Sequence, residues 1–220
     1  MKRIISLSII VNLLVSTVFV IFEPQISKAV ADEIVVTAEV TEEISISSPG
    51  DVLLASSIPS MTGNPGAPAS GSATWTVITA NATGFNLKIK ASTDPSMKNS
   101  DGEYFFHNYT PAVAASADYN WASPAVGSAE FGYSVTAATA ADTDTPFLND
   151  GSGCGGGLLN TDNQCWLNFN GVSDTTVINR NTNTTVAGEA EKVNFRAESN
   201  AAFLKEGYYD ATIIVTATVN

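Results

Sequence analysis

The chain has only one histidine and two cysteines among its 220 residues. A zinc site needs three or four Cys, His or carboxylate ligands, which argues against a cysteine- and histidine-rich metal centre. A catalytic Ser-His-Asp or Cys-His arrangement would have to use His107, but the stretch EYFFHNYTP shows no nucleophile pattern and the chain has no G-x-S-x-G. We therefore expect a protein that is not an enzyme. A secreted hydrolase built around His107 is the alternative from another class.

Basic residues are also few, because 10 Lys and Arg stand against 22 Asp and Glu. Residues 1–31 contain three basic residues and one acidic residue, so the remainder has 7 basic and 21 acidic residues and a net charge of −14. Nucleic-acid binding requires a basic surface that faces the phosphates. We expect no nucleic-acid partner.

The residue types that favour helices, namely Lys, Arg, Glu, Leu and Gln, are scarce as well. Ala, Thr, Ser, Asn, Val and Gly dominate instead. Thr and Val suit a pleated surface, while Asn and Gly suit turns. This composition predicts an all-β protein.

The one long apolar run lies at the N-terminus, in residues 4–22, after Lys2 and Arg3. It is followed by Ala29-Val30-Ala31, a small-x-small pattern that signal peptidase cleaves. We expect residues 1–31 to be a signal peptide and the secreted chain to begin at Asp32. The alternative is an uncleaved membrane anchor, because a run of 19 residues can just span a bilayer.

Apolar residues then alternate with polar ones from Ile34 to Val40 and again at Ile44 and Ile46. A period of two predicts one long half-buried strand, or two in line. A strand so close to the mature N-terminus is a candidate edge strand. Such an edge, over residues 33–47, could pair with another copy of the chain.

The clearest predicted hairpin joins residues 75–79 to residues 85–89 through the turn sequence NATG. Further strands are expected near residues 103–109, 129–139, 165–172, 175–180, 192–198 and 209–219. Many short strands without a helical period predict a single antiparallel β-sandwich over residues 32–220, Ig-like or jelly-roll-like. A sheet closed on itself is the alternative. Long loops are expected at residues 91–128 and 142–165.

Two stretches, residues 52–90 and 203–220, resemble the WxL-type surface domains of Gram-positive bacteria. Trp75-Thr76-Val77 would stand at the first family motif, and Tyr209, Ile213 and Val215 at the second. Both motifs depart from the family pattern, since Val replaces Leu in the first, and Ile and Val replace Trp and Leu in the second. The resemblance implies an extracellular β-domain that holds non-covalently to the cell wall.

The two cysteines, Cys154 and Cys165, lie 11 positions apart, with Gly155 to Gly157 directly after the first. In an oxidising compartment two such cysteines most simply form a disulfide. On the loop-entropy estimate this bond stabilises the fold by about 3 kcal/mol. We expect it to anchor a long loop to a strand that begins at Trp166.

Two groups of residues are candidate ligand sites. Tyr104, Tyr109, Tyr119 and Trp121 could form an aromatic surface for a glycan or a protein, or could cap one end of the fold. A second group of oxygen ligands, in the loop DTDTPFLND, could bind calcium or simply form turns; it comprises Asp142, Asp144 and Asp150. No other cofactor is expected.

Together these features predict a secreted, non-enzymatic protein of the cell surface with a structural or adhesive role. The expected partners are further copies of the chain, a cell-wall polymer, a glycan or other surface proteins. A membrane contact is expected only through an uncleaved signal. In one hypothesis an edge strand completes a neighbouring copy and builds a filament. In the other, the loops of a monomer bind a glycan or wall polymer.

Overall fold

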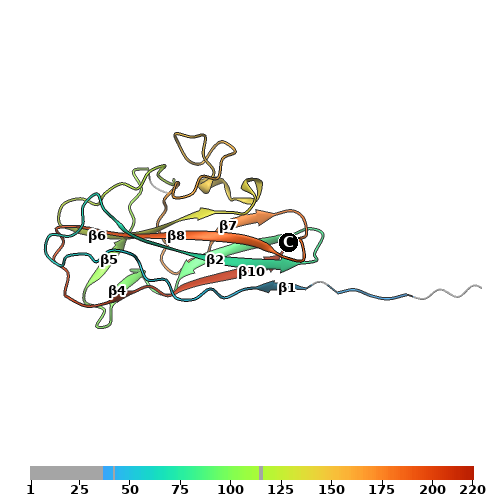
Figure 1. Cartoon of the computed structure of the whole chain (residues 1–220), viewed down its shortest axis with the longest axis horizontal. Helices are drawn as coiled ribbons and strands as arrows, with labels where there is room; N and C mark the ends of the chain where they lie inside the picture. Colours follow the sequence, from blue (N-terminus) through green and yellow to red (C-terminus); the bar gives the residue numbers. More distant parts are fainter. Residues whose placement is uncertain (1–36, 42, 114–115) are drawn as a thin grey trace, which may run out of the picture. The chain divides into compact units, whose positions relative to one another are not determined.

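The structure is a computed structural model that describes residues 37–41, 43–113 and 116–220 (Figure 1). It divides into two units, residues 1–40 and residues 41–220, and the strands all belong to the second unit. The expected signal peptide and the first residues of the expected N-terminal strand lie outside the described residues.

The prediction of an all-β protein is confirmed, because the described residues contain ten strands and no α-helix. Two short 3-10 turns, η1 (Ala140–Asp142) and η2 (Thr145–Phe147), lie in the loop before β7. The strands are β1 (Ile44–Ile46), β2 (Ala69–Thr79), β3 (Phe85–Ala91), β4 (Met97–Asn99), β5 (Phe105–Asn108), β6 (Ser128–Thr136), β7 (Thr175–Arg180), β8 (Glu189–Asn200), β9 (Tyr209–Asp210) and β10 (Ile213–Val219).

Seven strands form one sheet in the order β1-β2-β8-β6-β5-β4-β9. Its centre is the long antiparallel set of β2, β8 and β6, which run side by side in Figure 1. The pair of β5 and β6 is parallel, so the sheet is mixed and the expectation of purely antiparallel pairing is wrong at this point. The physical reason is the long connection from residue 109 to residue 127, which gives the chain room to return in the same direction.

The other three strands form a second sheet in the order β10-β3-β7, with β10 and β7 at its two edges. Both of its pairs are antiparallel, and the pair of β3 and β7 contains one irregularity between Leu87 and Lys88.

One hydrophobic cluster joins the two sheets. The inward rows of β3 and of the long strands all contribute to it, because alternate residues of a strand point to the same face. Its fully buried members include Val77, Phe85, Leu87, Ile89, Tyr133, Val135, Phe147, Val177, Ile178 and Val193.

The predicted hairpin of residues 75–79 and 85–89 is wrong, although both segments are strands. β2 pairs with β1 and β8, whereas β3 pairs with β10 and β7, so the turn carries the chain from one sheet to the other. Asn81 shapes this turn by accepting hydrogen bonds from the backbone N–H and the hydroxyl of Thr83. Alternation predicts which side chains face the core. Two strands that pair and two strands that face each other across the core show the same alternation, so this pattern does not reveal the pairing.

Three other segments differ from expectation. Residues 37–41 and 43 form no strand, and only Ile44–Ile46 pair with β2. Residues 165–172 make isolated bridges rather than the expected strand. The expected loop at residues 91–128 contains β4, which was not expected, besides β5, which confirms the strand expected near residues 103–109.

Candidate functional site

One hollow within the described residues is a groove with a volume of about 1200 Å³, which has a mainly apolar lining on its strands and a mixed lining on its connecting segments. Side chains from both sheets and from two connecting segments, residues 48–60 and 204–212, line it. The aromatic and larger apolar side chains among them are Trp75, Met97, Phe106, Phe131, Phe195, Leu204, Tyr209 and Ile213. The volume exceeds that of the pockets that hold drug-sized ligands, so the groove has room for a row of side chains.

One wall of the groove is the segment that follows β1. Ala55 pairs with Ser70 of β2 by two backbone hydrogen bonds, which holds this segment beside the start of β2. Val52 and Leu54 point inward over Gly71, where a Cβ atom would lie only 2.6 Å from a Val52 methyl. Gly71 thus allows the segment to pass close over the sheet.

The opposite wall ends at Ile213, the first residue of β10, whose outer edge pairs with no strand although β1 lies close to part of it. The hydrogen bonds Ser92 N–H to Thr212 O and Asn220 N–H to Gly84 O show that even-numbered residues of β10 bond to β3. In an antiparallel pair the intervening residues direct their backbone groups to the other side. The N–H and C=O groups of Ile213 and Val215 therefore face the open edge.

The rim of the groove carries exposed apolar side chains. Leu53 is 85% and Tyr208 84% exposed, and both line the groove. Met61 and Phe203, in the segments that adjoin these two, are also exposed. A group of exposed apolar side chains around a groove is typical of a contact surface.

Four charged residues line the groove: Asp51, Lys205 and Glu206 lie on the connecting segments, and Asp210 lies on β9. Lys205 forms an exposed ion pair of 2.6 Å with Asp101, which lowers the pKa of that carboxyl. Apart from Asp210, the strands contribute apolar side chains to the groove. It therefore suits an apolar occupant rather than an ionic one.

The four aromatic residues predicted as a ligand surface do not form one open face. Tyr109 is buried, stacks on Trp121 with 4.3 Å between ring centroids, and donates its hydroxyl to Asp118. Burial raises the pKa of the Tyr109 hydroxyl. Tyr104 and Tyr119 are half-buried, and Tyr104 lines a smaller hollow of about 190 Å³ beside His107. Burial leaves Tyr109 no face for a glycan.

Trp121 belongs to a layer of side chains that covers the outer face of the large sheet. Its indole N–H donates to the Glu198 carboxylate over 2.6 Å, and its ring meets Trp166 edge to face. Trp166 in turn lies 4.3 Å from the Arg196 guanidinium. This layer stabilises the sheet, and sequence patterns gave no indication of it because its members are far apart in the chain.

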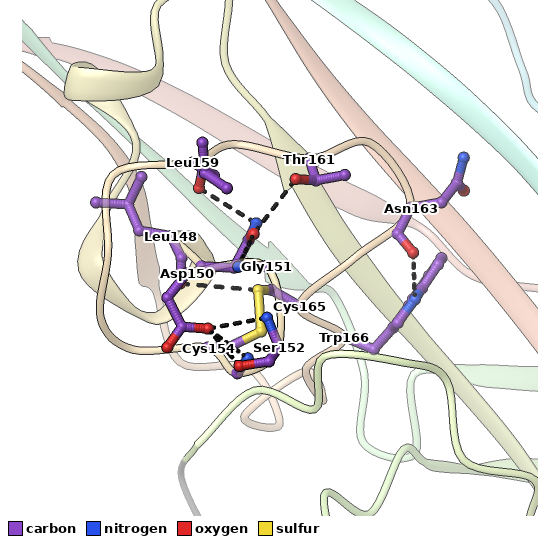
Figure 2. The surroundings of a disulfide bond; sticks show 12 residues. Leu148, Asp150, Gly151, Ser152, Cys154, Leu159, Thr161, Asn163, Cys165 and Trp166 are labelled. Carbon is purple, nitrogen blue, oxygen red and sulfur yellow. Dashed lines mark hydrogen bonds between the residues drawn. A yellow bond between two sulfur atoms is a disulfide. The ribbon is translucent and has the colours of Figure 1, made fainter.

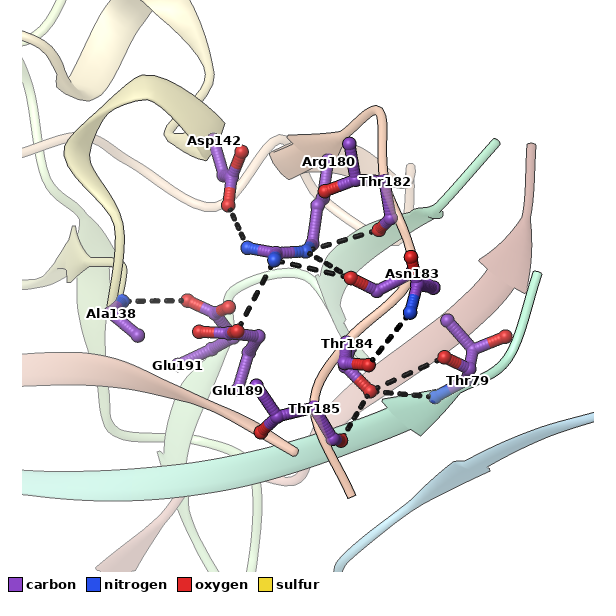
Figure 3. Close-up of polar contacts among 10 residues, drawn as sticks. All are labelled: Thr79, Ala138, Asp142, Arg180, Thr182, Asn183, Thr184, Thr185, Glu189 and Glu191. Carbon is purple, nitrogen blue, oxygen red and sulfur yellow. Dashed lines mark hydrogen bonds and ion pairs between the residues drawn. The ribbon is translucent and has the colours of Figure 1, made fainter. Parts of the chain in front are cut away.

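The predicted calcium ligands are in separate environments. Asp142 forms an ion pair of 2.6 Å with Arg180 (Figure 3). Asp144 is half-buried, and burial raises its pKa. Asp150 accepts hydrogen bonds from Ser152 and Gly153, which lower its pKa. Within the described ranges, no three His, Cys, Asp or Glu side chains lie together in a way that could hold a metal ion. The expectation of a shared calcium site is not met there.

Arg180 is the centre of an acidic cluster where β7 ends and β8 begins (Figure 3). Besides Asp142, it contacts Glu189 at 3.3 Å. Glu191 is 1% exposed and accepts a hydrogen bond from the Ala138 N–H. Burial is the main reason why the pKa of Glu191 rises to about 7.

The predicted disulfide is confirmed, with 5.7 Å between the Cα atoms of Cys154 and Cys165 (Figure 2). Asn149, which is fully buried, exchanges backbone hydrogen bonds with Leu159 inside the same loop. The disulfide connects this loop to Cys165, whose N–H donates to Tyr119 O. It therefore fixes two loops to each other, and no strand begins at Trp166.

His107 is exposed on β5 and packs edge to face against Phe105, with 5.0 Å between ring centroids. In the part of the chain that the structure describes, its imidazole makes no hydrogen bond to a Ser, Cys or Asp side chain. The arrangement shows no sign of an activated nucleophile.

The chain matches no protein-family model, no curated protein and no solved structure. The resemblance to WxL-type domains therefore stays a prediction. Of its motif positions, Trp75, Tyr209 and Ile213 line the groove, whereas Val77 and Val215 do not. In the described ranges, no helix combines the length and the apolar character needed to cross a bilayer.

Proposed function

We propose that the mature chain is an exported structural protein of the cell surface that assembles with further copies of itself. The observation that carries this proposal is the apolar groove beside the unpaired edge of β10. An open edge with an adjoining apolar groove is the arrangement through which proteins accept an added strand. Self-assembly is thus the function that this geometry supports best.

The groove also bears on the type of fold. We propose that the two sheets are the layers of a β-sandwich, Ig-like or jelly-roll-like, that is incomplete on the side between β2 and β10. The shared hydrophobic cluster supports two facing layers. The part-exposed inward row of β10 supports the missing cover on that side.

Export is supported by two features of different origin. The Cys154–Cys165 disulfide is of a kind that persists in oxidising compartments outside the cytosol. The sequence of residues 1–31 has the three regions of a cleaved leader. We propose a location at the cell surface, where the wall polymer that the WxL resemblance implies would be a further partner.

The test is the molar mass of the mature chain, residues 32–220, measured by light scattering over a range of concentrations. The proposal predicts assemblies that grow with concentration. The variant Leu53→Glu/Tyr208→Glu, which changes two exposed rim residues, should assemble at least tenfold more weakly. The control Leu158→Glu/Val186→Glu changes two exposed apolar residues that do not line the groove and should assemble normally. A wild-type chain that stays monomeric throughout would overturn the proposal.

A further inference from the structure

We infer that the occupant of the groove is a β-strand formed by residues 33–41 of a second copy, bound along the open edge of β10. This inference rests on the proposed self-assembly and names the segment that carries it. The donor would place Ile34, Val36, Ala38 and Val40 in the groove and exchange backbone hydrogen bonds with β10.

The acceptor edge presents the backbone hydrogen-bonding groups that such a strand needs. The backbone groups of Ile213 and Val215 point away from β3, toward the side where the groove opens. Each is a donor and acceptor pair that a neighbouring strand satisfies. A neighbouring strand supplies hydrogen-bonding partners for these backbone groups, whereas the packing of side chains alone does not.

The partial burial of the inward side chains of β10 also indicates that a neighbouring strand is missing. Val215 lies opposite Ile89 and Ala217 opposite Leu87, so these residues share one face of the sheet. On β3 this row is 0–1% exposed, yet on β10 it is only partly buried. A strand beyond β10 would cover the β10 row and bury it to the same extent.

The proposed donor has an alternating pattern that suits the groove. Ile34, Val36, Ala38 and Val40 fall on alternate positions, so they would enter the groove together, while Val35 would lie in the outward row. Val40, at the end of this row, is 89% exposed.

Charge complementarity favours a donor whose outward row lies on the outer face of the small sheet. Lys88 and Lys90 lie opposite Thr216 and Ile214, on the outer face of the small sheet. The outward row of the donor contains Glu39, which would share this face with the two lysines. Opposite charges on one sheet face are favourable, although modestly so at an exposed surface.

A second copy is favoured over the chain's own N-terminus. β1 pairs with β2 in an antiparallel register that places Ile44 opposite Thr79, and the Thr79 hydroxyl donates to Glu43 O. The groove is lined by residues 48–60, beyond the far end of β1, so to reach its own groove the segment would have to fold back through residue 42 alone, and the shortest common hairpin loop has two residues. Donation to a neighbour leaves that neighbour's own donor free, so the contact repeats head to tail and forms an open filament.

The experiment compares two double variants of the mature chain. Val36→Asp/Val40→Asp places charges in the inward row, whereas Thr37→Asp/Thr41→Asp adds the same charge to the outward row of the same segment. The first should remain monomeric at concentrations where wild type assembles, and the second should assemble with less than a threefold change. Val40, Thr37 and Thr41 are exposed, so changes at these three positions spare the folded core.

Mixing adds a second measurement. Val36→Asp/Val40→Asp keeps its groove, so it should accept a wild-type donor and end a growing assembly. One part in ten should therefore shorten wild-type assemblies. If wild type assembles and Val36→Asp/Val40→Asp assembles equally well, the donor assignment is overturned while the proposed function stands. If the variant is monomeric but leaves wild-type assemblies unchanged, the groove is not the acceptor. A monomeric wild type overturns both proposals.

Discussion

Trp121 donates its indole N–H to Glu198 over 2.6 Å, and the carboxylate that accepts this bond is fully buried. Glu198 also accepts a hydrogen bond from the Gly66 N–H at 2.7 Å. Replacing Trp121 by Phe keeps an aromatic ring against Tyr109 but leaves one carboxylate oxygen without its donor. We expect Trp121→Phe to lower the free energy of unfolding by about 2 kcal/mol in urea denaturation.

The double variant Trp121→Phe/Glu198→Gln is the matched control. Since Gln carries no charge, it should recover part of the loss if the hydrogen bond to a buried carboxylate is the cause. Equal stability of wild type and Trp121→Phe would mean that Trp121 is free for a ligand, as the aromatic-surface hypothesis requires.

Glu191 makes stability depend on pH in an unusual direction. Burial raises its pKa in the folded state to about 7, above the ordinary 4.5, so the folded chain holds a proton that the unfolded chain has lost. This contribution is complete below about pH 4.5 and is lost as the pH rises through 7, a change of about 3 kcal/mol. We expect Glu191→Gln to remove this part of the pH dependence. Denaturation curves at pH 5 and pH 8 that show the same dependence for both proteins would contradict the assignment.

The disulfide should stabilise the fold chiefly by reducing the number of conformations that the unfolded chain can adopt. We expect Cys154→Ala/Cys165→Ala to lower the free energy of unfolding by about 3 kcal/mol, as the entropy of the closed loop implies. Reductant should weaken wild type by a similar amount and leave the variant unchanged. Wild-type denaturation that is insensitive to complete reduction would refute this role.

Gly84 determines how the chain passes from one sheet to the other. Its φ is +83°, and a Cβ atom there would lie 2.0 Å from the backbone oxygen of Arg180. Gly84→Ala must therefore strain the turn and move β7, with an expected loss of about 2 kcal/mol or more. Gly102→Ala is the control, because its φ is also positive but open space surrounds it. Thermal unfolding should show a larger drop for Gly84→Ala, and equal drops would contradict the close contact.

Much of the fold could be predicted from the sequence because alternation reports which side chains are buried. Phe85, Leu87 and Ile89 were expected on one face, and they are fully buried. Pairing was not predictable to the same degree, as the segments around Trp75 and Phe85 show. Both point into one core from opposite sheets, so a local pattern cannot distinguish facing strands from paired ones.

The candidate site was predictable only in part. The N-terminal alternation indicated a strand available for another copy, but nothing in the sequence indicated an acceptor. The groove brings together Trp75, Phe131 and Tyr209, which are separated by more than fifty residues each. The edge of β10 becomes visible only once the register with β3 is known. Similarly, the long separation of Trp121 from Glu198 hid the side-chain layer on the outer face.

Hydrogen exchange at the β10 edge tests the central claim most directly. The measurement compares amide exchange of the mature wild-type chain in dilute solution and in the assembled state. The backbone N–H groups of Ile213 and Val215 should exchange freely in dilute solution and become protected on assembly, together with residues 37–40. Val36→Asp/Val40→Asp should show no such change. Assemblies in which Ile213 and Val215 still exchange as fast as in the dilute protein would contradict strand addition at β10.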